Sequence, residues 1–418
     1  MRVRLAVVFL MTFYLAQLPI NCVAADILKV VSDFEGASAR VVEIDQEARS
    51  ISFMPGGDPA RGWPCWWYFR IDGIAPGETI TLKLQGSLAA MGSQKPLSAS
   101  WAMPERATYA IDGLNWQHTD KGERRDEWMI YLLNPDATSV HVAWGPPYTP
   151  TTAAKFVSDA SERSPFAIAE ELCRSREGRA VPLLHVMEGE RDSADRFGVW
   201  VQARQHAWES GSSWVAQGFG EWLISDKDEA AWMRRHAEIF LVPIMDIDNT
   251  ATGNGGKNAI PQDHNRDWSA QPHWNEVSAA QRRLRTLIDA GRMDIFLDLH
   301  NPAPGDPTFF YVLPRDMLEE PMLSMRDRFI DRAYSKISSI RPMMPMSKTA
   351  KETGPSYHPL WKQMSGAWVT VNGNPHTVSL CLETSWNSAN STVSGYRAVG
   401  AALASAVQEQ LLERVEKQ

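Results

Sequence analysis

The feature that most constrains the fold is a change of sequence pattern near residue 150 of this 418-residue chain. Before it, short runs of β-branched and aromatic residues recur between Gly, Pro and Asp, and apolar and polar residues alternate over residues 79–84. After it, apolar runs of strand length alternate with helical patterns, which indicates a buried α/β sheet. We therefore predict a mixed central α/β sheet with helices on both faces, preceded by an antiparallel β-sandwich.

The segment 145–150 contains three prolines and marks the expected boundary between these two parts. We expect the sandwich to cover residues 26–150 and the α/β domain to cover residues 151–418. The last helix is expected to carry an apolar residue at every fourth position from Val399 to Val415.

The first 25 residues have the pattern of a secretory signal. Two arginines precede an apolar run over residues 5–15, and small residues at 22–25 offer a cleavage site. Lipidation of Cys22 is the alternative, but the polar Asn21 stands where lipidated chains carry a small residue. We predict a periplasmic or secreted bacterial protein. No later run is long and apolar enough for an integral membrane segment after cleavage.

Charge and cysteine content argue against two classes of protein. The formal net charge of −8 and the lack of a Lys/Arg-rich run argue against a nucleic-acid partner. Cys65, Cys173 and Cys381 remain after cleavage of the signal, and none is in a Cys-x-x-Cys pair. An odd number of cysteines does not define a disulfide framework. The 17 tryptophans indicate an aromatic core or a binding surface.

The chain contains three His-x-x-Glu pairs, which begin at His185, His206 and His273. Such a pair is a weak signal alone, so its surroundings must decide. His185 lies within an apolar strand, and His273 lies in a polar loop. By contrast, His206 and Glu209 directly follow a predicted strand that ends near residue 202. We therefore expect this second pair to bind metal.

Two further reactive side chains also end predicted strands. His300 follows residues 295–299, and Glu383 follows residues 378–382. Open α/β sheets bind ligands beyond the carboxyl ends of their strands, so both should lie near His206. Two histidines, one glutamate and water are the ligand set of a hydrolytic zinc centre.

Four ordered segments resemble motifs of zinc metallocarboxypeptidases of the cytosolic carboxypeptidase-like branch. They are residues 203–219, 242–268, 297–300 and 382–385, and residues 67–70 and 147–149 resemble landmarks of that branch's β-sandwich. The first motif usually reads His-Pro-Gly-Glu, whereas this chain has Ala207 and Trp208 between its two ligands. The resemblance implies that residues 151–418 form a zinc carboxypeptidase-like catalytic domain.

The resemblance also implies roles for individual residues. One Zn²⁺ per chain would be held by His206, Glu209 and His300. Glu383 would act as general base and acid, taking a proton from a zinc-activated water and giving it to the leaving amine. Arg266 would hold the terminal carboxylate of the substrate, and Asn265 would add a donor.

Three positions stay open at this stage. The family's additional arginine, which polarises the scissile carbonyl, is missing, and Lys257 is the candidate that replaces it. The substrate-closing tyrosine is Tyr357 or Tyr311, with Tyr357 preferred. Asp298 either orients a zinc ligand or is structural.

The leading interpretation is a zinc-dependent metallocarboxypeptidase whose substrate is a peptide with a free C-terminal carboxylate. One alternative is a zinc amidase or deacylase that acts on N-acyl amino acids or cell-wall peptides. Another is a non-catalytic protein that binds peptide or glycan. The first two share the same metal ligands and Glu383, so the motifs alone do not separate them.

Overall fold

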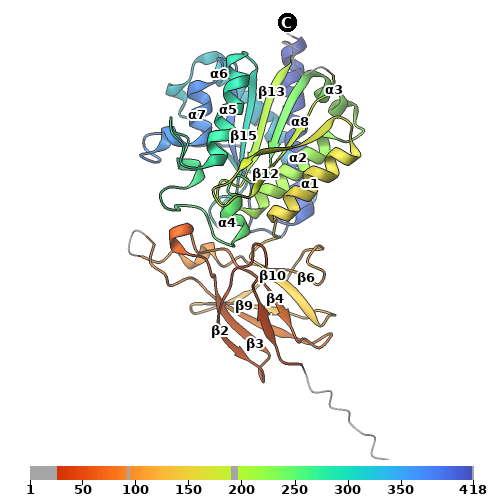
Figure 1. Ribbon diagram of the computed structural model, residues 1–418, viewed down its shortest axis with the longest axis vertical. Helices are drawn as coiled ribbons and strands as arrows, with labels where there is room; N and C mark the ends of the chain where they lie inside the picture. The colour runs from red at the N-terminus through yellow and green to blue at the C-terminus, as the bar shows by residue number, and fades with distance from the viewer. Residues whose placement is uncertain (1–25, 92–94, 190–195, 417–418) are drawn as a thin grey trace, which may run out of the picture.

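A computed structural model describes residues 26–91, 95–189 and 196–416. Two parts lie one above the other along the long axis, with the all-β part at the amino-terminal end of the chain (Figure 1). The expected signal sequence, residues 1–25, lies outside the described residues, so this assignment stays a prediction.

The amino-terminal part consists of two five-stranded sheets. One has the order β1 (Lys29–Val31), β4 (Tyr68–Asp72), β10 (Ser139–Ala143), β6 (Thr108–Ala110), β7 (Gln117–His118). The other has the order β2 (Arg40–Asp45), β3 (Ser50–Met54), β5 (Ile80–Gln85), β9 (Trp128–Leu133), β8 (Glu123–Arg125). All neighbours are antiparallel except β3 and β5, which pair in parallel. The rings of Phe53 and Phe69, from opposite sheets, lie 4.8 Å apart in the shared core.

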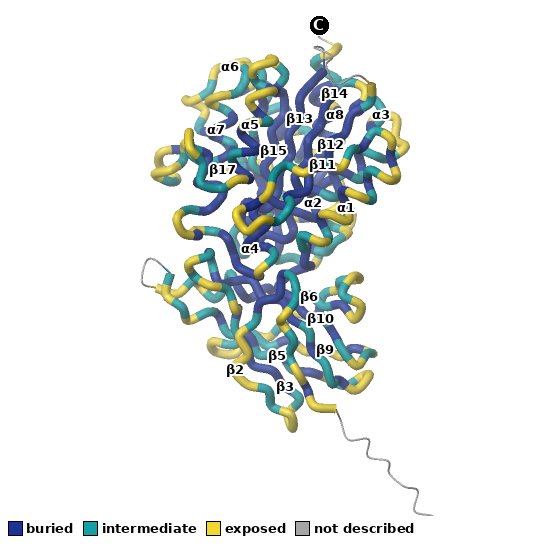
Figure 2. Tube along the Cα trace, in the orientation of Figure 1, coloured by how far each residue is buried: buried dark blue, intermediate teal, exposed yellow. Residues whose placement is uncertain are grey.

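The second part contains one mixed sheet of eight strands, which confirms the predicted fold class. Its order is β11 (Ala167–Arg174), β12 (Ala180–Val186), β14 (Ala237–Val242), β13 (Phe197–Ala203), β15 (Met293–His300), β18 (Val378–Glu383), β16 (Phe309–Val312), β17 (Lys351–Glu352). The central strands β14, β13, β15 and β18 are mutually parallel. They are almost wholly buried because helices cover both faces of the sheet (Figure 2).

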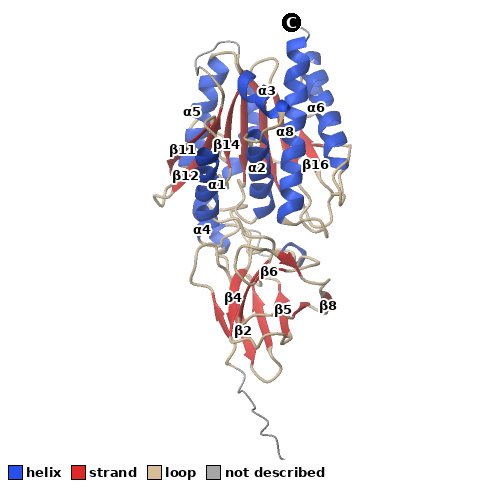
Figure 3. Ribbon diagram, turned by 90° about the vertical axis from the view of Figure 1, so that its right-hand side faces the viewer, coloured by secondary structure: helices blue, strands red, loops and turns tan. Residues whose placement is uncertain are grey.

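The helices form two layers around this sheet (Figure 3). One layer contains α1 (Pro150–Arg163), α2 (Ser210–Leu223), α3 (Asp228–His236), α6 (Glu320–Ser338) and α8 (Val393–Glu416). The other contains α5 (Asn275–Asp289) and α7 (Ser365–Asn372), and the short α4 (Ile247–Ala251) follows β14. No helix in the described part of the chain is long and apolar enough to cross a membrane.

Helices α2 and α8 approach each other closely because glycines lie at their contact. A Cβ atom at Gly218 would lie 2.1 Å from the Arg397 carbonyl oxygen, and one at Gly400 would lie 2.0 Å from the Val215 carbonyl oxygen. Val399 and the apolar residues that follow it at four-residue spacing are buried, except Val415, which is 41% exposed. This contact fixes α2, whose first turn follows the His206–Glu209 pair.

Tryptophans join the two parts of the molecule. Trp208 from the α/β part lies 5.5 Å from Trp101 and 5.4 Å from Trp144 of the sandwich, measured between ring centroids. Trp386, which follows β18, lies 4.3 Å from Trp144. Trp208 is 1% exposed and belongs to the core of the sandwich. The sandwich therefore packs directly on the loop that separates His206 from Glu209.

We expect Trp208→Ala to lower the free energy of unfolding by about 3–5 kcal/mol, because it leaves a large cavity in this aromatic cluster. Urea denaturation followed by circular dichroism would measure the loss. Leu114→Ala is the control, since Leu114 is 78% exposed and its truncation should change stability by less than about 0.5 kcal/mol. Equal effects of the two substitutions would contradict a structural role for Trp208.

Candidate active site

The carboxyl ends of three parallel strands bring the expected site residues together. His300 and Glu383 are the last residues of β15 and β18 and are direct neighbours in the register. The chain leaves β13 through Arg204, whose φ of 63° makes a sharp turn toward His206. The Arg204 guanidinium donates to the carbonyl oxygens of Ala207 and Tyr148. This turn holds His206 over the edge of the sheet.

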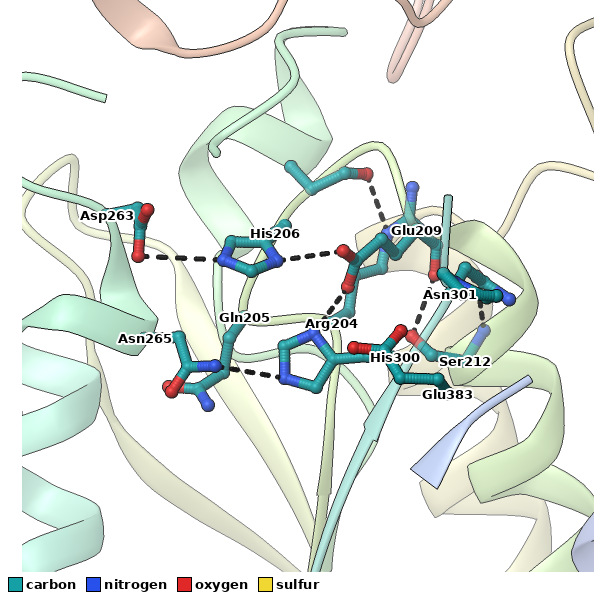
Figure 4. A network of polar contacts seen from close by, with 12 residues as sticks. Arg204, Gln205, His206, Glu209, Ser212, Asp263, Asn265, His300, Asn301 and Glu383 are labelled. Atoms are coloured by element: carbon teal, nitrogen blue, oxygen red, sulfur yellow. Dashed lines mark hydrogen bonds and ion pairs between the residues drawn. The ribbon is translucent and has the colours of Figure 1, made fainter. Parts of the chain in front are cut away.

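His206, Glu209 and His300 form one buried group. Glu209 Oε1 lies 2.8 Å from His206 Nδ1, and Oε2 lies 2.7 Å from His300 Nδ1 (Figure 4). Potential ligand atoms of the three residues lie within 4.8 Å of one another, and none of the residues is more than 2% exposed. Two imidazole nitrogens and a carboxylate facing one point are a donor set that fits Zn²⁺.

Each histidine turns its other nitrogen toward an aspartate. His300 Nε2 lies 2.9 Å from Asp298 Oδ2, and His206 Nε2 lies 3.6 Å from Asp263 Oδ1. With a proton on each Nε2, both Nδ1 atoms keep a free lone pair for a metal. Asp298 therefore orients His300. The sequence analysis missed Asp263, whose only signal was its place three residues before Arg266.

The two carboxylates that contact His206, those of Glu209 and Asp263, are held in the charged form. Burial raises the pKa of Glu209, but His206 and His300 outweigh it, and the net pKa lies below the usual value. Burial likewise raises the pKa of Asp263, and His206 and Arg266 outweigh it. For His300 burial lowers the pKa, and Asp298 and Glu209 raise it well above the usual value. These charged carboxylates therefore favour a positive charge in the space between His206, Glu209 and His300.

Glu383 faces the same space from β18 (Figure 4). It is 9% exposed, and burial raises its pKa to about 7. Its Oε1 lies 3.9 Å from the Cys381 thiol, and its Oε2 has no hydrogen-bond partner among the described residues. A carboxylate with a pKa near neutrality and an uncommitted oxygen is suited to accept and return a proton.

Asn265 and Arg266 lie beside the histidines in a short 3₁₀ turn (His264–Arg266). Arg266 is 8% exposed and donates from Nη1 to the Asn265 carbonyl oxygen. Asn265 Oδ1 accepts from the backbone nitrogen of Ser365, and its Nδ2 lies 3.4 Å from His300 Nε2. Because that Nε2 already donates to Asp298, the Asn265 amide remains a donor for an anion. Together the two side chains can bind a carboxylate.

His264 supports this turn from behind. Its ring nitrogens lie 3.7 Å from Asp246 and 3.6 Å from Glu276, and its ring stacks on Trp274. Burial lowers the pKa of His264, but the two carboxylates outweigh it and raise the pKa to about 9. This buried cation could not be predicted from the sequence, because its partners come from distant segments.

We expect the stability of the protein to fall above pH 7 through His264. The pKa is about 9 in the folded state and 6.5 in a free histidine, so its contribution is complete below pH 6.5 and is lost as the pH rises through 9. That gap corresponds to at most about 3 kcal/mol. Urea unfolding at pH 6 and pH 10 would measure it, and His264→Gln should flatten the dependence. His273→Gln is the control, and an equal effect of both would contradict the assignment.

Lys257 and Tyr357 line the same cavity of about 220 Å³ as the metal group, and so does Tyr311. The Lys257 ammonium lies 5.3 Å from the centre of the Trp63 ring. Gly256 has a φ of 77°, and a Cβ atom there would lie 2.7 Å from the Ala207 nitrogen. The loop therefore passes directly over the segment between the two ligands, which explains how Lys257 reaches the cavity. The two tyrosine rings are 5.3 Å apart, and Tyr357 is 42% exposed.

The other two His-x-x-Glu pairs have ordinary surroundings. His185 is buried between Glu170 and Glu238, at 2.9 and 3.1 Å. His273 lies near the surface against Trp274. Neither belongs to a possible metal group among the described residues. The three cysteines Cys65, Cys173 and Cys381 are free thiols.

The fold and the side chains of this cavity define a metallohydrolase of the carboxypeptidase type. A zinc carboxypeptidase family model matches residues 155–287, and a model of the cytosolic carboxypeptidase N-terminal domain matches residues 30–144. The α/β part of the chain thus matches the zinc carboxypeptidase family, and the sandwich matches the amino-terminal domain of the cytosolic carboxypeptidases.

Individual relatives agree with these two matches. An uncharacterised protein of Zymomonas mobilis is 25% identical over 318 residues, which are 75% of this chain and 77% of that protein. Cytosolic carboxypeptidase 2 of Danio rerio is 25% identical over 272 residues, which cover 59% of this chain and 37% of that relative. The chain thus spans little more than a third of the length of that relative.

Solved structures share the fold over nearly the whole chain. A metallo-carboxypeptidase from Burkholderia cenocepacia has a TM-score of 0.78 at 22% identity and covers 93% of this chain and 99% of its own. A metallo-carboxypeptidase from Pseudomonas aeruginosa, in complex with (2-guanidinoethylmercapto)succinic acid, has a TM-score of 0.74 at 21% identity, covering 92% and 99%.

Proposed function

We propose that this protein is a zinc-dependent carboxypeptidase that hydrolyses the C-terminal peptide bond of a peptide. The observation that carries the proposal is one cavity lined by the metal group, Glu383 and the Asn265–Arg266 pair. An amide bond next to a free carboxylate uses all three, and the C-terminal bond of a peptide is such a bond. Export to the periplasm or the extracellular space is part of the proposal and is supported by the pattern of residues 1–25.

His206, Glu209 and His300 would hold the Zn²⁺, which supplies Lewis acidity to the site when bound. Arg266 offers two N–H donors to the two oxygens of the terminal carboxylate, and Asn265 offers a third. This contact fixes where the scissile bond lies and so orients it for attack.

Glu383 moves the proton. It accepts the proton of the attacking water and returns it to the leaving amine, and burial keeps its pKa close to the value this exchange requires. Lys257 places a positive charge where negative charge develops on the carbonyl oxygen. Tyr357 stands at the mouth of the cavity, where it can cover bound substrate.

Metal content and C-terminal release together test the proposal. We expect one zinc per chain and release of the last residue from peptides with a free C-terminus. The same peptides with an amidated C-terminus should react at least about 100-fold more slowly, because Arg266 loses its charged partner. Zinc without peptide cleavage, but with hydrolysis of N-acyl amino acids, would replace the proposal with an amidase or deacylase. Absence of both zinc and cleavage would favour a binding protein.

A further inference from the structure

A second, smaller cavity of about 30 Å³ adjoins the first. Four residues line both cavities: Asn265, Tyr311, Met364 and Cys381. Of the residues that line only the smaller one, Gly366 and Thr370 belong to α7 and Ser379 belongs to β18. The smaller cavity therefore adjoins Asn265, next to Arg266 in the chain, and neither Trp63 nor Trp101 lines it.

This position makes it the pocket for the side chain of the last substrate residue, an assignment that rests on the proposed function. The terminal carboxylate and that side chain are bonded to the same carbon atom. If Asn265 and Arg266 hold the carboxylate, the side chain must enter the nearest open space. Asn265 lines that space directly.

The pocket offers no partner for a charged side chain. Neither lysine nor arginine is among the residues that line it, and the one acid is Asp298. The Asp298 Oδ2 atom already accepts hydrogen bonds from His300 Nε2, Gln205 Nε2 and Ser365 Oγ. An acidic substrate residue would meet this negative charge, and a basic one would find the carboxylate occupied. An unpaired charge in such a place is strongly unfavourable.

The polar groups of the pocket are satisfied by one another. The hydroxyls of Thr370 and Ser379 both donate to the Gly366 carbonyl oxygen, at 2.7 and 2.9 Å. Apart from Asp298, the walls are therefore uncharged, and these two hydroxyls make no unmet demand for a hydrogen bond. A side chain that enters needs neither charge nor a special donor.

The size of the pocket limits what enters. A water needs about 10–15 Å³ of such space, so about 30 Å³ admits roughly two groups of that size. A methyl or hydroxymethyl group fits, whereas an aromatic ring does not. We propose that the enzyme selects C-terminal residues with small, uncharged side chains, such as Ala or Ser.

The test uses the zinc-loaded full chain and peptides that differ only in a C-terminal Ala, Ser, Glu, Lys or Phe. We expect kcat/KM for the Ala and Ser peptides to exceed that for each of the other three at least 100-fold. Preference for Glu, Lys or Phe would overturn the inference while the proposed function stood. Cleavage of none of the peptides would overturn the proposed function and the inference with it.

A charge placed in the pocket provides a second test. Thr370→Arg should raise kcat/KM for the Glu peptide at least tenfold and lower it for the Ala peptide. Val371→Arg is the matched control, because Val371 is the next residue of α7, is 69% exposed and does not line the pocket. The same change of preference in both variants would contradict the assignment of the pocket. If Thr370→Arg fails to fold, the peptide series with the unaltered protein still decides.

Discussion

Replacing Glu383 with glutamine is expected to lower kcat by roughly 10²–10⁴-fold, the usual contribution of a general acid–base group, while zinc binding is retained. Glutamine has nearly the shape of glutamate but neither accepts nor returns the proton. Glu383 is not one of the three residues whose nitrogen and oxygen atoms face one another in the metal group. Because the change acts on proton transfer, KM should change much less than kcat.

Steady-state release of the C-terminal residue and zinc content, measured on the same preparations, would check this prediction. Glu352→Gln is the matched control, since Glu352 is an exposed acid that also ends a strand of the central sheet. It should retain the activity of the unaltered protein. Nearly full activity of Glu383→Gln, or loss of zinc from it, would contradict the assigned role.

The sequence predicted the parts of the site that end buried strands. His300 and Glu383 each follow a mainly apolar run, and such runs form parallel strands whose ends meet at one edge. The order of the strands was not needed for this inference. The fold class could be predicted for the same reason, because the change from two-residue alternation to strand–helix alternation is a local property of the chain.

The sequence did not predict what depends on contacts between distant segments. Asp263 reaches His206 across 57 residues of chain, and the two carboxylates around His264 come from separate segments. No periodicity records such contacts, because each partner sits in a loop or begins a helix. The parallel pairing of β3 and β5 escaped prediction in the same way, since both strands alternate as antiparallel ones do.

The two parts of the molecule share the active cavity. Trp63 and Trp101 of the sandwich line it together with Trp208, and their rings form a continuous series. Trp208 occupies the place where the family motif usually has glycine. Its large ring fills the space between the ligand loop and the sandwich. The packing of Trp208 against the tryptophans of the sandwich therefore explains both the departure from the motif and the many tryptophans at this contact. The sandwich is therefore a wall of the site as well as a neighbouring domain.

Three substitutions at increasing distance from the metal group offer a graded test of metal binding. His206→Gln should abolish stable zinc binding, because it removes one of three ligands. Asp263→Asn should weaken zinc binding about 10–100-fold, since it only weakens the contact that orients His206. His273→Gln should leave affinity unchanged, although it alters the same sequence pattern. The metal affinity should thus be lowest for His206→Gln, intermediate for Asp263→Asn and unchanged for His273→Gln.

Competition with a chelator of known zinc affinity would measure this order, with circular dichroism to show that each variant is folded. Equal affinity of His206→Gln and His273→Gln would remove the basis of the proposed zinc site. A loss in Asp263→Asn as large as that in His206→Gln would make Asp263 a direct ligand rather than an orienting partner. Asp263 Oδ1 lies 3.6 Å from His206 Nε2, on the side of the ring away from Glu209. This position argues for the orienting role.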